Sequence, residues 1–308
     1  MRVLFWGTPE FAAPPLRALI GEGFEVVGVV TQPDKPQGRS RAIIPPPVKQ
    51  IATEEEIPIF QPKNARVPEL FETLKGLKPD ISIVVAYGHI LPQRIIDLPP
   101  MGTLNIHASL LPALRGAGPI QAAIREGLTE TGVSVMRVVP ALDAGPVLLQ
   151  ASMPIYDDEA FGELQNRLSE LGALTLIEAL TLLSLGKATE TIQDESRASY
   201  APKVTRESSR INWHDTALEI SQLIRASDPK PGAFTKTPRG DVKLFEPKVM
   251  DGIEGEPGEV LKVTGELVIA CGTDALRINE VQPSGKTRMS AHEWARGRGT
   301  LVGDRYGE

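Results

Sequence analysis

Asn105 and His107 are the pair of residues whose types and spacing best suit catalysis. They lie in the run GTLNIH at 102–107, which has the apolar and β-branched residues of a short strand. Because side chains two positions apart on a strand point to the same face, Asn105 and His107 project together and Ile106 points away. An amide that donates a hydrogen bond and an imidazole that shuttles a proton suit acyl transfer. On spacing alone, a polar pair that satisfies its own hydrogen bonds at a strand end is an equally acceptable interpretation.

Asp143 is the acidic residue that can join this pair. It lies in LDAG at 142–145, after the β-branched run at 132–139 and 36 positions (143 minus 107) beyond His107. An aspartate in such a loop is most often a solvated turn former. If the two strands are neighbours, Asp143 reaches His107 and favours the charged form of the imidazole.

The segment after His107 reads SLLPALRGAGPI from 109 to 120. Its proline and glycine residues constrain the backbone and let it approach a ligand closely, although a plain loop has the same composition. Open α/β sheets bind ligands at the carboxyl ends of their strands, which favours a functional interpretation of this segment.

The turn GTPEF at 7–11 follows the apolar run VLFW and resembles the opening of a nucleotide-binding half. It contains one glycine, so the G-x-G-x-x-G fingerprint is absent and a tight strand-to-helix turn is favoured over NAD binding. None of the four histidines pairs with another at metal-ligand spacing. We therefore expect no metal, and we interpret His89 as a loop residue that lines the site at most.

Apolar runs at 3–6, 26–30, 81–86, 102–107 and 132–139 alternate with helical patterns, and leucines recur at helical spacing from 161 to 185. This alternation is typical of βαβ units. Short strand-like runs broken by glycine and proline dominate the sequence after residue 240. The predicted fold class is α/β, with a Rossmann-like, mostly parallel sheet domain followed by a small C-terminal β-barrel (OB-like) domain. We place the first domain at 1–188, a polar linker at 189–208 and the barrel at 209–308.

The composition limits the possible function classes. The chain has 308 residues and a formal net charge of -6, which excludes a uniformly basic nucleic-acid binder but not a local basic patch. Its single cysteine, Cys271, forbids an intramolecular disulfide and fits a reducing cytoplasm. The longest apolar stretch, 173–185, contains Glu178 and is too short to cross a bilayer. We expect a cytoplasmic monomer that does not contact membranes.

Four segments resemble the folate-dependent formyltransferase family. They are FWGTPEFAAPPL near the start, AYGHILP at 86–92, LNIHASLLPALRGAGPIQ at 104–121 and LDAGPVL at 142–148. The pattern Asn-x-His-x-Ser-Leu-Leu-Pro, with an aspartate further along the chain, is that family's active-site signature. Two more segments, TQPDKPQGRSRAIIPPPVK at 31–49 and SYAPKVTRESSRINW at 199–213, are similar to the branch of the family that acts on transfer RNA.

The resemblance implies transfer of a formyl group from 10-formyltetrahydrofolate to the α-amino group of the methionine on initiator tRNA, for translation initiation. Asn105, His107 and Asp143 occupy the family's three catalytic positions. The family's folate-contact segment corresponds to Ser109, Leu110, Leu111 and Pro112. The implied partners are the formyl donor and initiator methionyl-tRNA, with no obligate protein partner.

Three short segments are basic within this acidic chain. The ranges 33–49, 197–210 and 286–298 each contain four lysines or arginines against one acidic residue, a net of +3 each. Each such segment alone is compatible with ordinary solvated surface, but their positions on the insert, the linker and the barrel favour contacts with phosphates. We expect Arg39 and Arg41 on the insert and Lys203 in the linker to bind tRNA.

Other functions remain compatible with the same signature. A formyltransferase that acts on a nucleotide-linked amino sugar retains a similar barrel, whereas one that acts on glycinamide ribonucleotide normally lacks the second domain. An enzyme that removes the formyl group by hydrolysis or oxidation is a more distant alternative, and a non-catalytic tRNA- or folate-binding protein belongs to another class. The basic insert favours the tRNA substrate, and the intact Asn105, His107 and Asp143 favour catalysis.

Overall fold

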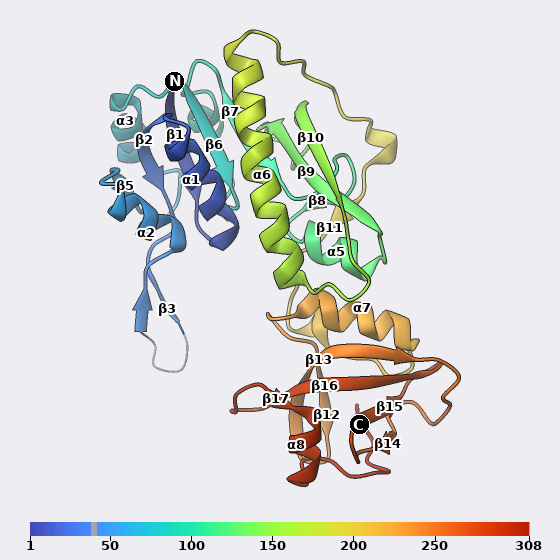
Figure 1. Ribbon diagram of the computed structural model, residues 1–308. Helices are drawn as coiled ribbons and strands as arrows, with labels where there is room; N and C mark the ends of the chain where they lie inside the picture. The colour runs from blue at the N-terminus through green and yellow to red at the C-terminus, as the bar shows by residue number, and fades with distance from the viewer. Residues whose placement is uncertain (38–41, 308) are drawn as a thin grey trace. The chain divides into compact units, whose positions relative to one another are not determined.

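The structure is a computed structural model that describes residues 1–37 and 42–307 (Figure 1). The chain divides into two units. The first consists of Met1–Gly116, Thr131–Met153 and Gln165–Tyr200, and the second of Ala117–Glu130, Pro154–Leu164 and Ala201–Glu308. The domain boundaries expected from composition stay a prediction.

A seven-stranded sheet forms the centre of the first unit. Its strands in spatial order are β10 (Val147–Pro154), β9 (Glu130–Arg137), β7 (Thr103–His107), β6 (Ile81–Val85), β1 (Arg2–Gly7), β2 (Glu25–Val30) and β5 (Ile59–Phe60). The pairs from β7 to β5 are parallel, and β9 pairs with β7 in the antiparallel direction. The predicted mostly parallel sheet is therefore confirmed.

Helices connect the parallel strands, as the alternation of apolar runs predicts. They are α1 (Ala13–Gly21), α2 (Pro47–Glu54), α3 (Pro68–Gly76) and α4 (Gln93–Ile96), with a short 3-10 turn η1 (Glu10–Ala12) before α1. Helix α5 (Pro119–Arg125) precedes the antiparallel strand β9, and the long α6 (Phe161–Ser184) follows β10. Gly7 ends β1 at a tight turn, because a Cβ there would lie 2.7 Å from Phe5 Cε1 and 2.8 Å from Ala12 Cβ. The structure thus contains the expected strand-to-helix turn between β1 and α1.

Helix α6 packs on one face of the sheet and leaves Asn105 and His107 on the other. A Cβ added at Gly172 of α6 would lie 3.1 Å from Ile106 Cγ2, so Ile106 faces this helix. The alternation of a strand then directs its two neighbours to the opposite face. Ser169 of α6 also donates a hydrogen bond to the Phe11 carbonyl, which holds the helix beside η1.

Short elements complete the first unit and lead into the second. The insert forms a hairpin of β3 (Lys35–Gln37) and β4 (Ala42–Ile44), and β8 (Arg115–Gly116) pairs with β11 (Tyr200–Ala201). Two further 3-10 turns are η2 (Glu195–Arg197) and η3 (Glu207–Ser209). None of the helices in the described ranges combines the length and apolarity that a membrane span requires.

The second unit contains a six-stranded antiparallel sheet, which confirms the predicted small β domain. Its main path is β12 (Phe234–Thr237), β13 (Gly240–Met250), β16 (Ala275–Pro283), β15 (Leu267–Ala270) and β14 (Val260–Lys262), with β17 (Met289–Ser290) beside β16. Helix α7 (Ala217–Ser227) begins with a capping box made by Thr216 and Glu219, and α8 (Ala291–Arg296) follows β17.

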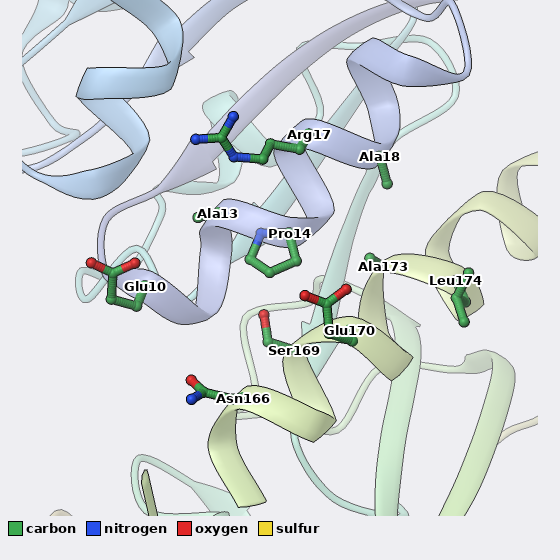
Figure 2. A pocket seen from close by; sticks show the side chains of 10 residues that line it. All are labelled: Glu10, Ala13, Pro14, Arg17, Ala18, Asn166, Ser169, Glu170, Ala173 and Leu174. Carbon is green, nitrogen blue, oxygen red and sulfur yellow. The ribbon is translucent and has the colours of Figure 1, made fainter. Parts of the chain in front are cut away.

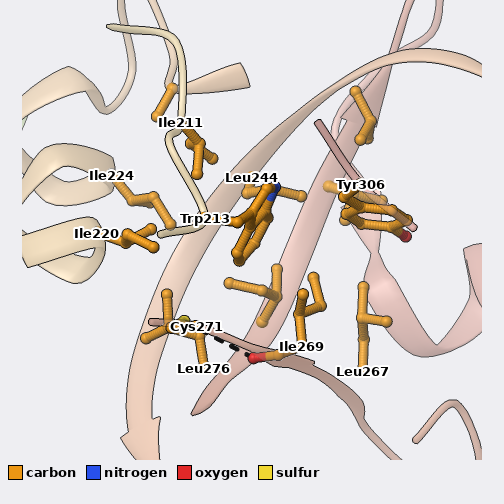
Figure 3. Close-up of a cluster of buried hydrophobic side chains, with 14 of the residues drawn as sticks. Ile211, Trp213, Ile220, Ile224, Leu244, Leu267, Ile269, Cys271, Leu276 and Tyr306 are labelled. Carbon is orange, nitrogen blue, oxygen red and sulfur yellow. Dashed lines mark hydrogen bonds between the residues drawn. The ribbon is translucent and has the colours of Figure 1, made fainter. Parts of the chain in front are cut away.

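Apolar side chains from this sheet and α7 form a separate core (Figure 3). Ile220 and Ile224 of α7 face Leu244 and Leu276 of the sheet, and all four are fully or almost fully buried. Trp213 fills the space between them and donates its indole N–H to the Thr235 hydroxyl at 2.9 Å. This satisfied polar atom lets a large aromatic ring lie in an apolar core.

Cys271 lies in this core, where burial raises the pKa of its thiol to about 12. Because only the thiolate attacks disulfide reagents, Cys271 of the native protein is expected to react at least about 10²-fold more slowly than an exposed cysteine at pH 8. Labelling with a chromogenic disulfide, with and without denaturant, measures both rates. A native rate equal to the denatured rate contradicts the burial, and Cys271→Ser controls for other reactive groups.

Candidate active site

His107 ends β7 in a buried position and has a partner on each ring nitrogen. Its side chain is 6% exposed. Nε2 lies 2.9 Å from the Leu114 carbonyl, which can only accept, so Nε2 carries a proton. Nδ1 lies 3.6 Å from Oδ2 of Asp143. A neutral ring therefore turns a lone pair toward the carboxylate, and protonation of Nδ1 converts this contact into an ion pair.

Asp143 contacts His107 although β9 is antiparallel to β7 and therefore ends at the opposite end of β7 from His107. Arg137, the last residue of β9, pairs with Leu104, three residues before His107. The chain must return by roughly 10 Å along β7, at about 3.3 Å per residue, before the carboxylate can face the imidazole. Asp143 has a φ of 48°, a left-handed conformation that aspartate tolerates better than most residues.

The Asp143 carboxylate is held by the loop that follows His107. The Gly116 backbone N–H donates to Oδ2 at 2.8 Å, and the side chain of Asp143 is 16% exposed. A charged acceptor makes such a bond stronger than a neutral one does. The same loop therefore supplies a carbonyl to His107 and an N–H to Asp143, and the predicted approach of these two side chains is confirmed.

Asn105 lies two residues before His107, on the same face of β7. It pairs with Met136 of β9 and with Val84 of β6, so strands flank it on both sides. Its side chain is half-buried. Since its neighbour Ile106 faces α6, the amide is on the face that carries the imidazole.

Ser134 of β9, which pairs with His107 of β7, holds the Ser109–Pro112 segment through two hydrogen bonds. The Ser134 hydroxyl donates to the Ser109 carbonyl at 2.6 Å and accepts from the Leu111 N–H at 3.1 Å. Gln150 of β10 donates to both the Ser134 hydroxyl and the Leu111 carbonyl. The segment is therefore a fixed loop, and Ser134 and Gln150 are residues that the sequence analysis missed.

His89 lies in the loop after β6 and is exposed. Its Nδ1 is 3.1 Å from the Gln32 amide nitrogen, which also donates to the Tyr87 carbonyl. The Tyr87 ring meets His89 edge-on at 5.8 Å, and burial raises the pKa of the Tyr87 hydroxyl to about 12. His89 is thus a loop residue with local partners.

Of the three residues expected to bind tRNA, the structure describes only Lys203. Arg39 and Arg41 lie outside the described residues, and Lys203 is exposed in the loop after β11. The base of the insert is fixed, because Lys49 donates to Asp34 at 2.6 Å and Gln61 donates to the other carboxylate oxygen at 2.7 Å. These two bonds hold the pKa of Asp34 below its usual value.

Some charges of the basic segments are already paired. Arg288 makes ion pairs with Asp228, Glu246 and Glu280 and lies 4.2 Å from the centre of the Phe245 ring. Arg206 pairs with Asp241 at 2.9 Å. The net charge of +3 therefore overstates the positive charge that 197–210 and 286–298 offer to a polyanion.

A separate pocket of about 820 Å³ lies between α1 and α6 (Figure 2). Glu10 and Arg17 line it on one side, and Asn166 and Glu170 line it on the other. None of the residues that line this pocket belongs to the cluster around His107. The pocket has both acidic and basic residues in its lining and lies between two helices, so it is distinct from the site around His107.

Comparison with known proteins gives two family matches. Residues 1–180 match the model described as formyl transferase, and residues 203–299 match the formyl transferase C-terminal domain. Methionyl-tRNA formyltransferase of Methylococcus capsulatus is 47% identical over 308 residues, which cover 100% of both chains.

Two solved structures share the fold at lower identity. Methionyl-tRNA formyltransferase from Clostridium thermocellum superposes with a TM-score of 0.56 and 16% identity, over 82% of this chain and 95% of that one. HypX from Aquifex aeolicus in complex with tetrahydrofolic acid has a TM-score of 0.66 and 22% identity, over 95% of this chain and 46% of that one.

The buried serines of the sheet allow a matched test of the loop support. Ser134→Ala leaves the Leu111 N–H and the Ser109 carbonyl without a hydroxyl, so the free energy of unfolding is expected to fall by about 1–3 kcal/mol. Ser82→Ala is the control, because Ser82 is equally buried in β6 and its hydroxyl has no partner among the described residues. Urea unfolding measures both, and equal effects of the two variants contradict the assignment.

Proposed function

The chain belongs to the formyl transferase family, and from that premise we propose that it transfers a formyl group from 10-formyltetrahydrofolate to the α-amino group of initiator methionyl-tRNA. The observation that carries the proposal is the pairing of His107 with Asp143 beside Asn105. An imidazole with a carboxylate at one nitrogen and an amide on the same strand face suits acyl transfer to an amine. The full-length likeness to methionyl-tRNA formyltransferase supports the acceptor.

The donor supplies a formyl group already activated for attack by an amine. Two exposed apolar side chains fit an aromatic donor: Ile90, 77% exposed in the loop after β6, the parallel neighbour of β7, and Leu142, 59% exposed and next to Asp143 in the sequence. The fixed backbone of Ser109–Pro112 supports the assignment of this segment to donor binding. Tetrahydrofolic acid bound to HypX, which has the same fold, adds support for a folate.

Each residue of the cluster has a distinct role in the proposed reaction. Asn105 donates its amide N–H to the formyl oxygen as negative charge develops there, a contribution on the order of 10²–10³ in rate. His107 takes the proton that the attacking amine loses and returns one to the leaving nitrogen. Asp143 orients the ring and stabilises the imidazolium between the two transfers. None of these steps requires a metal ion.

Positively charged side chains hold the acceptor in this proposal. We assign Arg39 and Arg41 of the insert and Lys203 after β11 to phosphate contacts. The hairpin base formed by Lys49, Asp34 and Gln61 supports this assignment, because it gives the insert a fixed anchor. In this proposal residues 1–188 carry out catalysis, 189–208 link the domains and 209–308 assist tRNA binding. The enzyme acts as a cytoplasmic monomer.

His107→Asn tests the proton shuttle. The variant keeps a polar side chain but cannot exchange protons near neutral pH, so kcat is expected to fall by about 10²–10⁴-fold. Donor binding, measured by equilibrium titration, is expected to stay unchanged. The assay uses charged initiator tRNA and 10-formyltetrahydrofolate and quantifies formylmethionine. Near-wild-type turnover of His107→Asn would rule out the proposed role.

Arg41→Leu tests the insert. Loss of one phosphate contact is expected to raise KM for the tRNA and to lower the salt dependence of binding by about one unit of slope, without a change in donor KM. Arg17→Leu is the matched control, since Arg17 is an exposed arginine on α1. If Arg41→Leu and Arg17→Leu share the same tRNA kinetics, the insert does not hold the acceptor.

A further inference from the structure

The segment that follows α6 returns to the loops that carry His107 and Asp143. Gln193, Glu195 and Ser199 of this segment all form hydrogen bonds to residues more than 48 positions away, within the first unit. We call residues 193–199 the clamp segment. Its polar composition is that of a linker, but its side chains form hydrogen bonds to the two loops of the candidate site.

Gln193 holds the backbone on both sides of Ala144. Its amide nitrogen donates to the Asp143 carbonyl at 2.8 Å and to the Gly145 carbonyl at 2.7 Å. The residue is 8% exposed. The loop is tight here, because a Cβ at Gly145 would lie 1.9 Å from the Arg137 carbonyl. One side chain thus fixes the turn that brings Asp143 back toward His107.

Arg115 connects Gln193 to the loop after His107. Its Nε and Nη2 donate to the Gln193 side-chain oxygen at 3.1 and 2.9 Å, and its guanidinium pairs with both carboxylate oxygens of Glu195. The Arg115 side chain is 1% exposed, so these bonds satisfy a buried charge. Hydrogen bonding to Arg115 holds the pKa of Glu195 below its usual value.

Arg115 lies between the two backbone groups that hold the catalytic pair. The carbonyl before it, on Leu114, accepts from His107, and the N–H after it, on Gly116, donates to Asp143. Ser199 fixes the same stretch, since its hydroxyl accepts from the Leu114 N–H at 2.9 Å and its carbonyl from the Arg115 N–H at 2.8 Å. Leu114 has a φ of 58°, a conformation that needs such support.

We propose that Gln193, Arg115 and Ser199 are positioning residues that set the geometry of His107 and Asp143 through the two loops they join. The inference rests on the proposed formyl transfer. None of the three has to touch either substrate. Their effect is transmitted by the Leu114 carbonyl, the Gly116 N–H and the backbone at Asp143, so it concerns the chemical step and not substrate binding.

Gln193→Met is the direct test, because methionine has a similar size and cannot make the four bonds. A misplacement of about 1 Å costs on the order of 10²-fold in rate, so kcat is expected to fall by about 10–100-fold. KM for the donor and for the charged tRNA are expected to stay within about threefold, since the binding residues are not altered. The pH dependence of kcat is expected to change as well, because the surroundings of His107 and Asp143 differ.

Asp194→Ala is the matched control within the clamp segment. The Asp194 carboxylate accepts hydrogen bonds from the N–H and hydroxyl of Ser196 and caps the local turn η2. Its removal is expected to leave kcat and its pH dependence at wild-type values. A loss in Asp194→Ala equal to that in Gln193→Met overturns the proposal, because the effect would then be general to the segment.

Ser199 provides a second test if Gln193→Met does not fold. Ser199→Ala removes the acceptor of the Leu114 N–H and is expected to lower kcat, and Ser199→Thr, which keeps the hydroxyl, is expected to restore it. Unchanged kcat in Gln193→Met or Ser199→Ala overturns the proposal, as does a change in KM alone. Wild-type protein in the same assay separates the two claims: absence of formylmethionine there contradicts the proposed function itself.

Discussion

The antiparallel register of β7 against β9 is the constraint on which the candidate site depends. It places the end of β9 beside Leu104, whereas the imidazole that Asp143 must face lies at the other end of β7. A parallel neighbour would deliver its following loop to the correct edge directly. Here the loop has to return, and it does so through a left-handed aspartate and a glycine that tolerates contact with a backbone carbonyl.

Ordering each residue of such a loop costs about 1–2 kcal/mol of backbone entropy, so the loop keeps one conformation only where other groups stabilise it. The structure supplies these groups from two directions. Gly116 holds the carboxylate from the loop after β7, and Gln193 holds the carbonyls from the segment after α6. The His107–Asp143 contact is therefore the product of three chain segments that are distant in sequence.

Much of this arrangement could be predicted from the sequence, because its signals are local. The β-branched runs of β7 and β9 mark two strands, and the alternation along β7 places Asn105 and His107 on one face. The direction of β9 could not be predicted, since a short apolar run has the same pattern in either direction. Strand β10 was missed because only Val147 and Leu148 at its start are buried, and the residues after its short apolar run are half-buried or exposed up to Pro154.

The contacts of the clamp segment could not be predicted from the sequence. Its composition is that of a solvated linker, and its bonds to Arg115 and Leu114 span 78 and 85 positions. A glutamine whose amide satisfies two backbone carbonyls leaves no periodic signal. Gln193, Glu195 and Ser199 are explained by their hydrogen bonds to two catalytic loops, which only the folded chain brings together.

In the proposed reaction, formyl transfer depends on the carboxylate that faces His107. A rapid-quench measurement of a single turnover in Asp143→Asn, with donor and charged tRNA both saturating, tests it most directly because product release does not contribute. The transfer rate of Asp143→Asn is expected to be at least about 10²-fold below wild type, with unchanged donor binding. A single-turnover rate equal to that of the wild-type protein would contradict it.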